Sequence, residues 1–191
     1  MIKRESLLSL EAYARERNAF RARVIEHKKR RTARLGEHLT LLFEDELTIR
    51  YQVQEMLRIE RIFEEDGIQH ELDAYNPLVP DGANWKATML IEYPDADERR
   101  RMLAALKGLE REVWVRVEGH PRVRAIADED LERENEEKTS SVHFLRFELD
   151  SPMREALRRG AAVQVGVEHP HYRAAVDLTR EQRGALVSDL A

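Results

Sequence analysis

The chain has 191 residues, 42% hydrophobic and 36% charged, with a formal net charge of -5, and this length can bury one substantial core but hardly two. Acidic and basic side chains are interspersed, which disfavours a dedicated nucleic-acid binder. The sequence contains no cysteine, which excludes disulfides, thiolate metal sites, iron–sulfur ligation and cysteine nucleophiles.

The N-terminal residues do not resemble a targeting signal. The apolar stretch Leu7–Leu10 is followed at once by Glu11 and is far shorter than the central region of a signal peptide. No later stretch reaches the roughly 18 to 20 continuous apolar residues of a membrane-spanning helix. We therefore expect a cytoplasmic protein without a membrane partner.

Residues 1–76 form the first of two regions and are predicted to be mainly helical. Residues 5–31 have helix-forming composition, an imperfect apolar stripe and no Gly or Pro. Alternating apolar residues at 39–43 predict a short strand. Asp45 then suits the cap of a second long helix, which is predicted to run to about residue 65 and to stop at Gly67.

The second helix is apolar almost all the way round, which predicts burial on more than one side and a place as the spine of the core. Its apolar residues are Leu47, Ile49, Val53, Met56, Leu57, Ile59, Ile62 and Phe63. Helical spacing brings Tyr51 close to Glu55, with Glu44 just ahead of the cap. Buried Glu is costly unless it is paired, hydrogen-bonded or metal-bound, so these three residues are a candidate oxygen-rich metal site. The alternative is that Glu55 pairs with Arg58 or with another basic residue.

A cluster of basic residues ends the first helix. It comprises Lys28, Lys29, Arg30, Arg31 and Arg34. Such a cluster at 28–34 could meet nucleic-acid phosphates. It equally suits a solvated terminus at the negative end of a helix dipole, and this second interpretation is favoured.

Residues 77–191 form the second region, which opens with an irregular segment at Pro77–Gly82. The predicted elements after it follow the order strand, helix, strand, strand, and this order occurs twice. The first unit comprises a strand at 84–93, a helix from Asp95 to about 107, and strands at 112–117 and 122–127. The second comprises a strand at 142–149, a helix at 151–159, and strands at 162–167 and 173–177.

The two units also share residues. His120–Asp128 and His169–Asp177 agree at five of nine positions, which are His, Pro, Arg, Ala and Asp. Duplication is the best explanation. The predicted class is α+β, with long N-terminal helices packed on a mostly antiparallel sheet built from two tandem strand-helix-strand-strand repeats, and with residues 1–76 and 77–191 in one compact domain.

Equivalent histidines in the two units add to the candidate metal ligands. A quasi-twofold axis would let His120 and His169 face one another and share a metal or another ligand. The same His-Pro pairs can be explained without a metal, because proline favours an extended backbone where the following strand begins. The full set of candidate ligands, with iron or haem as candidate cofactors, is Glu44, Tyr51, Glu55, His70, His120, His143 and His169.

An acidic insertion, residues 128–138, separates the two units. Such a run is usually an exposed helix or loop, and it could also dock a basic partner. The sequence lacks a nucleophile elbow, a P-loop, a dinucleotide fingerprint and paired Glu-x-x-His segments. A catalytic site assembled from distant segments remains open, so the sequence does not decide whether the protein is an enzyme.

Three segments carry a family resemblance: residues 51–58 (YQVQEMLR), 75–92 (YNPLVPDGANWKATMLIE) and 137–147 (EKTSSVHFLRF). The chain resembles, over essentially its whole length, a bacterial family of unknown function, DUF family 3501. The family has no established activity, so the resemblance supplies no catalytic residues. Genes of the family tend to lie beside those for rubrerythrin-like di-iron proteins and an iron–sulfur oxidoreductase subunit, which implies peroxide defence or iron-linked redox metabolism.

Three hypotheses follow, in descending order. The first is a non-catalytic accessory module that docks onto a redox partner, either rubrerythrin-like or an iron–sulfur oxidoreductase. The second is a metal- or haem-binding protein, catalytic or not, that uses the Glu, Tyr and His candidates. The third is a nucleic-acid-binding regulator that uses the cluster at 28–34. A homodimer formed through a free sheet edge is also open, as is closure of the sheet within one chain.

Overall fold

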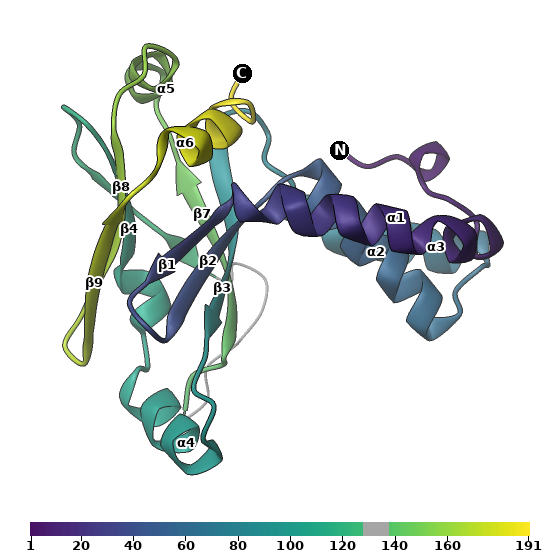
Figure 1. Cartoon of the computed structure of the whole chain (residues 1–191), viewed down its shortest axis with the longest axis horizontal. Helices are drawn as coiled ribbons and strands as arrows, with labels where there is room; N and C mark the ends of the chain where they lie inside the picture. Colours follow the sequence, from purple (N-terminus) through teal and green to yellow (C-terminus); the bar gives the residue numbers. More distant parts are fainter. Residues whose placement is uncertain (128–137) are drawn as a thin grey trace.

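Residues 1–127 and 138–191 are described in a computed structural model of the chain, and over these residues it forms six α-helices and two antiparallel sheets. The α+β class predicted from the sequence is therefore confirmed. Figure 1 shows two lobes, one made of the sheets and one made of three helices that extends to their side. The predicted acidic insertion, apart from Lys138, lies outside the described residues.

The first sheet has five antiparallel strands in the order β1-β2-β3-β7-β6. These strands are β1 (Thr32–Leu35), β2 (Leu39–Glu44), β3 (Asn84–Ile91), β7 (Val142–Glu148) and β6 (Ile126–Ala127). The second sheet has the order β5-β4-β8-β9. Its strands are β5 (Arg122–Arg124), β4 (Val113–Val117), β8 (Val163–His169) and β9 (Tyr172–Asp177). Alternate residues of both sheets point into one shared apolar core, because successive side chains of a strand alternate between its faces.

The two sheets meet at both sides within one chain. On one side, β5 and β6 follow each other directly, so this stretch pairs with β4 in one sheet and with β7 in the other. On the other side, Tyr172 Oη of β9 donates a hydrogen bond to Leu35 O of β1 at 2.5 Å and accepts one from His38 N at 3.1 Å. At this side the tyrosine side chain connects the two sheets, while β1 and β9 remain the outer strands of their own sheets.

The element order strand, helix, strand, strand is present at 84–127 and again at 142–177, with α4 (Ala96–Ala105) and α5 (Ser151–Arg158) as the helices. The strands form two sheets where the sequence led us to expect one, because β3, β6 and β7 join the first sheet while β4, β5, β8 and β9 form the second. Antiparallel pairs β3–β7 and β4–β8 join the units. Duplication as their origin stays a prediction.

The three helices of the second lobe form a separate, smaller core. They are α1 (Leu10–Lys29), α2 (Glu46–Glu60) and α3 (Glu65–Tyr75), preceded by a short 3-10 turn at Arg4–Ser6. The buried residues of this core, which come from α2, α3 and the segment before α1, are Ile2, Leu7, Ile49, Val53, Leu57, Ile68 and Leu72. We name this unit the helical lobe, and the two sheets with α4–α6 the sheet lobe.

The prediction that α2 is buried on several sides as the spine of the core is wrong. The helix starts at the end of β2 and leads away from the sheets, so α1 and α3 cover one stripe of it (Figure 1). Ile59 and Phe63, which the apolar pattern placed in the core, have 59% and 69% of their surface exposed.

The predicted cap of α2 is confirmed. Asp45 Oδ1 accepts a hydrogen bond from Thr48 N, and Thr48 Oγ1 accepts one from Asp45 N, both at 2.9 Å. The helix ends earlier than expected, at Glu60, because Arg61 adopts the left-handed conformation with φ of 54°. Gly67 therefore lies within α3 and does not end α2.

A C-terminal helix, α6 (Arg180–Val187), was not predicted. Thr179 caps it, with Thr179 Oγ1 accepting from Gln182 N and Gln182 Oε1 accepting from Thr179 N. Leu186 on α6 is buried in the core of the sheet lobe, and Trp85 Nε1 donates to its carbonyl at 3.0 Å. No helix in residues 1–127 or 138–191 has the length and apolar character needed to cross a bilayer.

Candidate functional site

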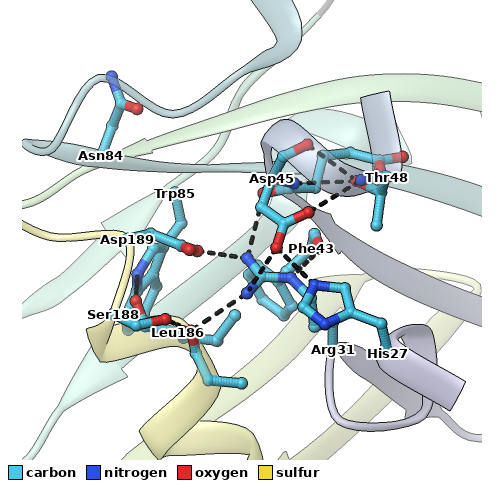
Figure 2. A network of polar contacts seen from close by, with 12 residues as sticks. His27, Arg31, Phe43, Asp45, Thr48, Asn84, Trp85, Leu186, Ser188 and Asp189 are labelled. Carbon is cyan, nitrogen blue, oxygen red and sulfur yellow. Dashed lines mark hydrogen bonds and ion pairs between the residues drawn. The ribbon is translucent and has the colours of Figure 1, made fainter. Parts of the chain in front are cut away.

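A buried arginine lies where the two lobes join. Arg31, with 2% of its surface exposed, follows α1 and immediately precedes β1. Figure 2 shows its guanidinium between the start of α2 and the end of α6, with Asp45 and Asp189 directed toward it. We name this set of contacts the junction network.

Every nitrogen of the Arg31 guanidinium has an acceptor. Nε donates to Phe43 O at 2.8 Å, Nη1 donates to Ala185 O at 3.1 Å, and Nη2 donates to Glu44 O at 3.2 Å. The guanidinium also pairs with the carboxylates of Asp189, through Nη2, and of Asp45, with 3.5 Å between Nη1 and Oδ2. A buried arginine with this number of acceptors is compatible with folding, because its lost hydration is replaced.

His27, near the end of α1, completes the junction network. Its Nε2 lies 2.5 Å from Asp45 Oδ2, and this nitrogen must carry the proton because an ionised carboxylate only accepts. Asp45 therefore binds Arg31 and His27 and caps α2 at the same time. One carboxylate thus connects the end of α1 to the beginning of α2.

The two aspartates of the junction network are shifted in opposite directions. Burial alone would raise the pKa of Asp45, but Arg31, the Thr48 backbone and His27 together outweigh it and lower that pKa. Burial dominates at Asp189 and raises its pKa despite the contact with Arg31. The lowered pKa of Asp45 stabilises the fold at pH values above the pKa that this carboxyl has in the unfolded chain. The raised pKa of Asp189 weakens the fold as pH rises, so the pH effects of the two aspartates oppose each other.

Glu44, a predicted metal ligand, is 1% exposed and has hydrogen bonds to both of its carboxylate oxygens. Thr48 Oγ1 donates at 2.5 Å, Thr88 Oγ1 at 2.6 Å and Gln52 Nε2 at 3.2 Å. Neutral donors therefore hold this carboxylate between α2 and β3. A metal ion would have to compete with all three.

Glu55, the second predicted ligand, is bound inside the helical lobe. Arg17 donates to both oxygens, at 2.7 and 2.9 Å, Tyr13 Oη donates at 2.7 Å, and Arg58 Nη2 donates at 3.2 Å. Hydrogen bonds from Arg17 are the main reason why the pKa of Glu55 falls to about 2. The pairing with Arg58 that the sequence suggested is present. We name Tyr13, Arg17, Glu55 and Arg58 the Glu55 cluster.

Of the other predicted ligands, Tyr51 lies beside the Glu55 cluster, and the histidines lie elsewhere. Tyr51 contacts the Phe20 ring edge-on, with 5.8 Å between the centroids, and His70 is exposed on α3. His143 is buried on β7, with Nε2 2.9 Å from Thr139 Oγ1. No group of three or more His, Asp or Glu able to hold a metal ion occurs within the described residues.

His120 and His169 do not face each other. The β4–β8 register pairs Val117 with Val163 and Val113 with Val167. His120 follows Val117 and His169 follows Val167, so the two histidines lie at opposite ends of this antiparallel pair. The Nε2 of His169 lies 3.1 Å from Lys107 O instead.

The basic cluster at 28–34 does not form one surface. Arg31 is inside the junction network, and Lys29 Nζ pairs with Glu26 at 2.6 Å. Lys28 Nζ lies 5.9 Å from the centre of the Tyr51 ring. Arg30 and Arg34 are exposed. A solvated terminus therefore describes part of the cluster, and no local pattern indicated that Arg31 is buried.

Comparisons with known proteins give a family but no activity. The family model described as "Protein of unknown function (DUF3501)" matches residues 1–190, which confirms the resemblance read from the sequence. A crystal structure from Burkholderia pseudomallei K96243, described as a novel protein of unknown function, is 56% identical. The alignment covers 100% of this chain and 99% of that chain, with a TM-score of 0.95. No curated protein matches.

Proposed function

The chain belongs to the DUF3501 family of unknown function, and we propose that it is a non-catalytic cytoplasmic module that docks onto a protein of redox metabolism through the free end of its helical lobe. The observation that carries this proposal is the exposure of two large apolar side chains, Ile59 and Phe63, at the connection between α2 and α3. This connection lies at the end of the lobe farthest from the sheets (Figure 1).

The polar surroundings of these two side chains indicate the character of the partner. Exposed acidic residues adjoin them in sequence, namely Glu60, Glu64, Asp66 and Glu65, the last of which pairs with Arg4. Arg61 is the exposed basic residue of the same stretch, so the charge there is negative. A complementary surface would present basic residues around an apolar centre, because interface cores exclude water while charged rims steer association.

The state of the buried polar groups supports binding rather than catalysis. Arg31, Glu44 and Glu55 have their hydrogen-bonding capacity occupied by other groups of the chain. A catalytic acid, base or nucleophile needs access to substrate, and strongly bound internal partners oppose that access. These three groups, two of them buried and Glu55 half-buried, therefore act in the architecture of the chain.

The class of partner comes from the family resemblance. The gene neighbourhood that the resemblance implies contains rubrerythrin-like di-iron proteins and an iron–sulfur oxidoreductase subunit. Either would be a redox protein to which a module without its own cofactor could dock. The metal- or haem-binding and nucleic-acid hypotheses stay predictions, because the described residues bring neither set of candidates together.

The test is direct binding to each purified redox protein, measured by calorimetry. Replacing Ile59 and Phe63 together by serine should weaken binding at least tenfold, because apolar anchors dominate interface energies. The matched control is Ile25→Ser, which alters an apolar residue of α1 that is 51% exposed, and it should leave the affinity unchanged. Equal affinity for the wild type and the double variant, or no binding of either redox protein, would contradict the proposal.

A further inference from the structure

A groove lies between α1, α2 and the segment that precedes α1. Its volume is about 440 Å³, which falls within the range of small-molecule sites. Leu8, Phe20, Arg23, Arg50 and Gln54 are among the residues that line it. None of them belongs to the junction network, and none is Ile59 or Phe63, so the groove is independent of the proposed docking surface.

The wall of the groove formed by the N-terminal segment is held in place by a buried glutamine. Gln54 Oε1 accepts a hydrogen bond from Leu8 N at 2.6 Å, and Gln54 Nε2 donates to Leu8 O at 3.3 Å. The side chain is buried, and both ends of its amide are engaged with this one residue. The groove is therefore pre-formed, which lowers the entropic cost of binding.

Two arginines from facing helices supply positive charge to the groove. Arg23 is on α1 and Arg50 is on α2. The Arg23 guanidinium lies 4.9 Å from the centre of the Phe20 ring. Within the described residues neither arginine has a carboxylate partner, in contrast to Arg17, which is bound by Glu55 in the same lobe.

The rest of the lining combines apolar surface with a single acid. Leu8, Ala19 and Phe20 supply the apolar part, and Glu16 is the one carboxylate in the lining. Two arginines against one glutamate leave an excess of positive charge. Arginine binds carboxylate and phosphate groups in a bidentate geometry, and the adjoining apolar surface can bury a hydrocarbon.

We propose that this groove binds an organic anion, with a carboxylate or phosphate head at Arg23 and Arg50 and an apolar body against Leu8 and Phe20. Both parts of the ligand are required. A small inorganic anion would leave the apolar wall uncovered, and a neutral hydrocarbon would leave the two guanidinium groups without a partner.

The test is calorimetric titration of the full chain with four probes. Octanoate and octyl phosphate carry both parts, whereas inorganic phosphate and 1-octanol carry one part each. Octanoate or octyl phosphate should bind with a stoichiometry of one. The probe with the higher affinity shows whether the groove prefers a carboxylate or a phosphate head group. Inorganic phosphate and 1-octanol should bind at least about tenfold more weakly, since one charge-assisted contact or a few buried methylenes each account for a factor of that order.

Two variants show whether the anion binds in this groove. Arg50→Gln should weaken binding of the preferred probe about tenfold without changing the thermal midpoint, because Arg50 has no ion-pair partner to lose within the described residues. Arg21→Gln, at an exposed position of α1 outside the lining, is the matched control and should bind as the wild type does. Undiminished binding in both Arg50→Gln and Arg23→Gln, or no binding of either amphipathic probe at millimolar concentration, would overturn the proposal.

Discussion

The helical lobe and the sheet lobe are stabilised in different ways. The sheet lobe contains a continuous apolar cluster drawn from both sheets and from α4–α6, whereas the apolar cluster of the helical lobe has seven buried residues. The helical lobe adds the Glu55 cluster, in which one carboxylate joins α1 to α2 through Arg17 and Tyr13. A small apolar core supplies limited stabilisation, so charge-assisted hydrogen bonds carry a larger share of the stability in the helical lobe.

The two lobes can be followed separately in solution. Both tryptophans, Trp85 and Trp114, lie in strands of the sheet lobe, so fluorescence reports the unfolding of that lobe. The longest helices lie in the helical lobe, so circular dichroism at helical wavelengths is weighted toward it. Differences between the two signals measure how strongly the lobes are coupled.

The largest expected effect comes from removing the contact between the lobes. Arg31→Met leaves Asp45 and Asp189 without their shared cation and should lower the free energy of unfolding by about 4 kcal/mol. Because the junction network includes residues from both lobes, the fluorescence and circular dichroism midpoints should both fall in urea titrations.

Arg30→Met is the matched control, since Arg30 is the exposed neighbour in sequence, and it should change the free energy of unfolding by less than about 0.5 kcal/mol. If Arg31→Met lowered one midpoint and left the other unchanged, the junction network would stabilise only the lobe whose midpoint fell.

An intermediate effect, confined to the helical lobe, is expected for Glu55→Gln. The variant loses the carboxylate that binds Arg17 and should lower the free energy of unfolding of this lobe by about 2 kcal/mol at neutral pH. The circular dichroism midpoint in urea should fall more than the fluorescence midpoint. Glu60→Gln, at an exposed position on the same helix, serves as the control and should behave as the wild type does.

The same cluster predicts a pH dependence. The folded pKa of Glu55 is lowered from 4.5 to about 2, so its stabilisation is fully present above about 4.5 and is lost as pH falls through about 2. The difference between wild type and Glu55→Gln should therefore shrink over that range. A difference that stays constant from pH 7 to pH 2 would assign the effect to packing rather than to charge.

Local patterns predicted the elements well, whereas long-range polar contacts could not be predicted. Strict alternation predicted β4, and the Asp45 cap follows from the residues beside it. The burial of Arg31 depends on Ala185 and Asp189, more than 150 residues later in the chain. No periodicity connects positions that far apart.

The apolar pattern of α2 also allowed two interpretations, and only the tertiary structure distinguishes between them. An apolar surface all round α2 is equally expected of a helix buried on several sides and of one with an exposed binding end. Phe63 lies on the exposed end, and nothing in its neighbouring residues indicates this. By contrast, the missed helix α6 had a local signal, because Thr179 and Gln182 have the spacing of a capping box.

The smallest expected effect concerns that helix and is confined to the sheet lobe. Thr179→Ala removes the hydroxyl that accepts from Gln182 N, and loss of an N-cap costs about 1 kcal/mol. The fluorescence midpoint should fall accordingly, because α6 carries Leu186, whose carbonyl accepts from Trp85. Thr179→Ser keeps the hydroxyl and should retain most of the stability. A larger loss with Thr179→Ala, accompanied by a fall in the circular dichroism midpoint, would mean that α6 also holds Ala185 and Asp189 on Arg31, and that the two lobes unfold as one unit.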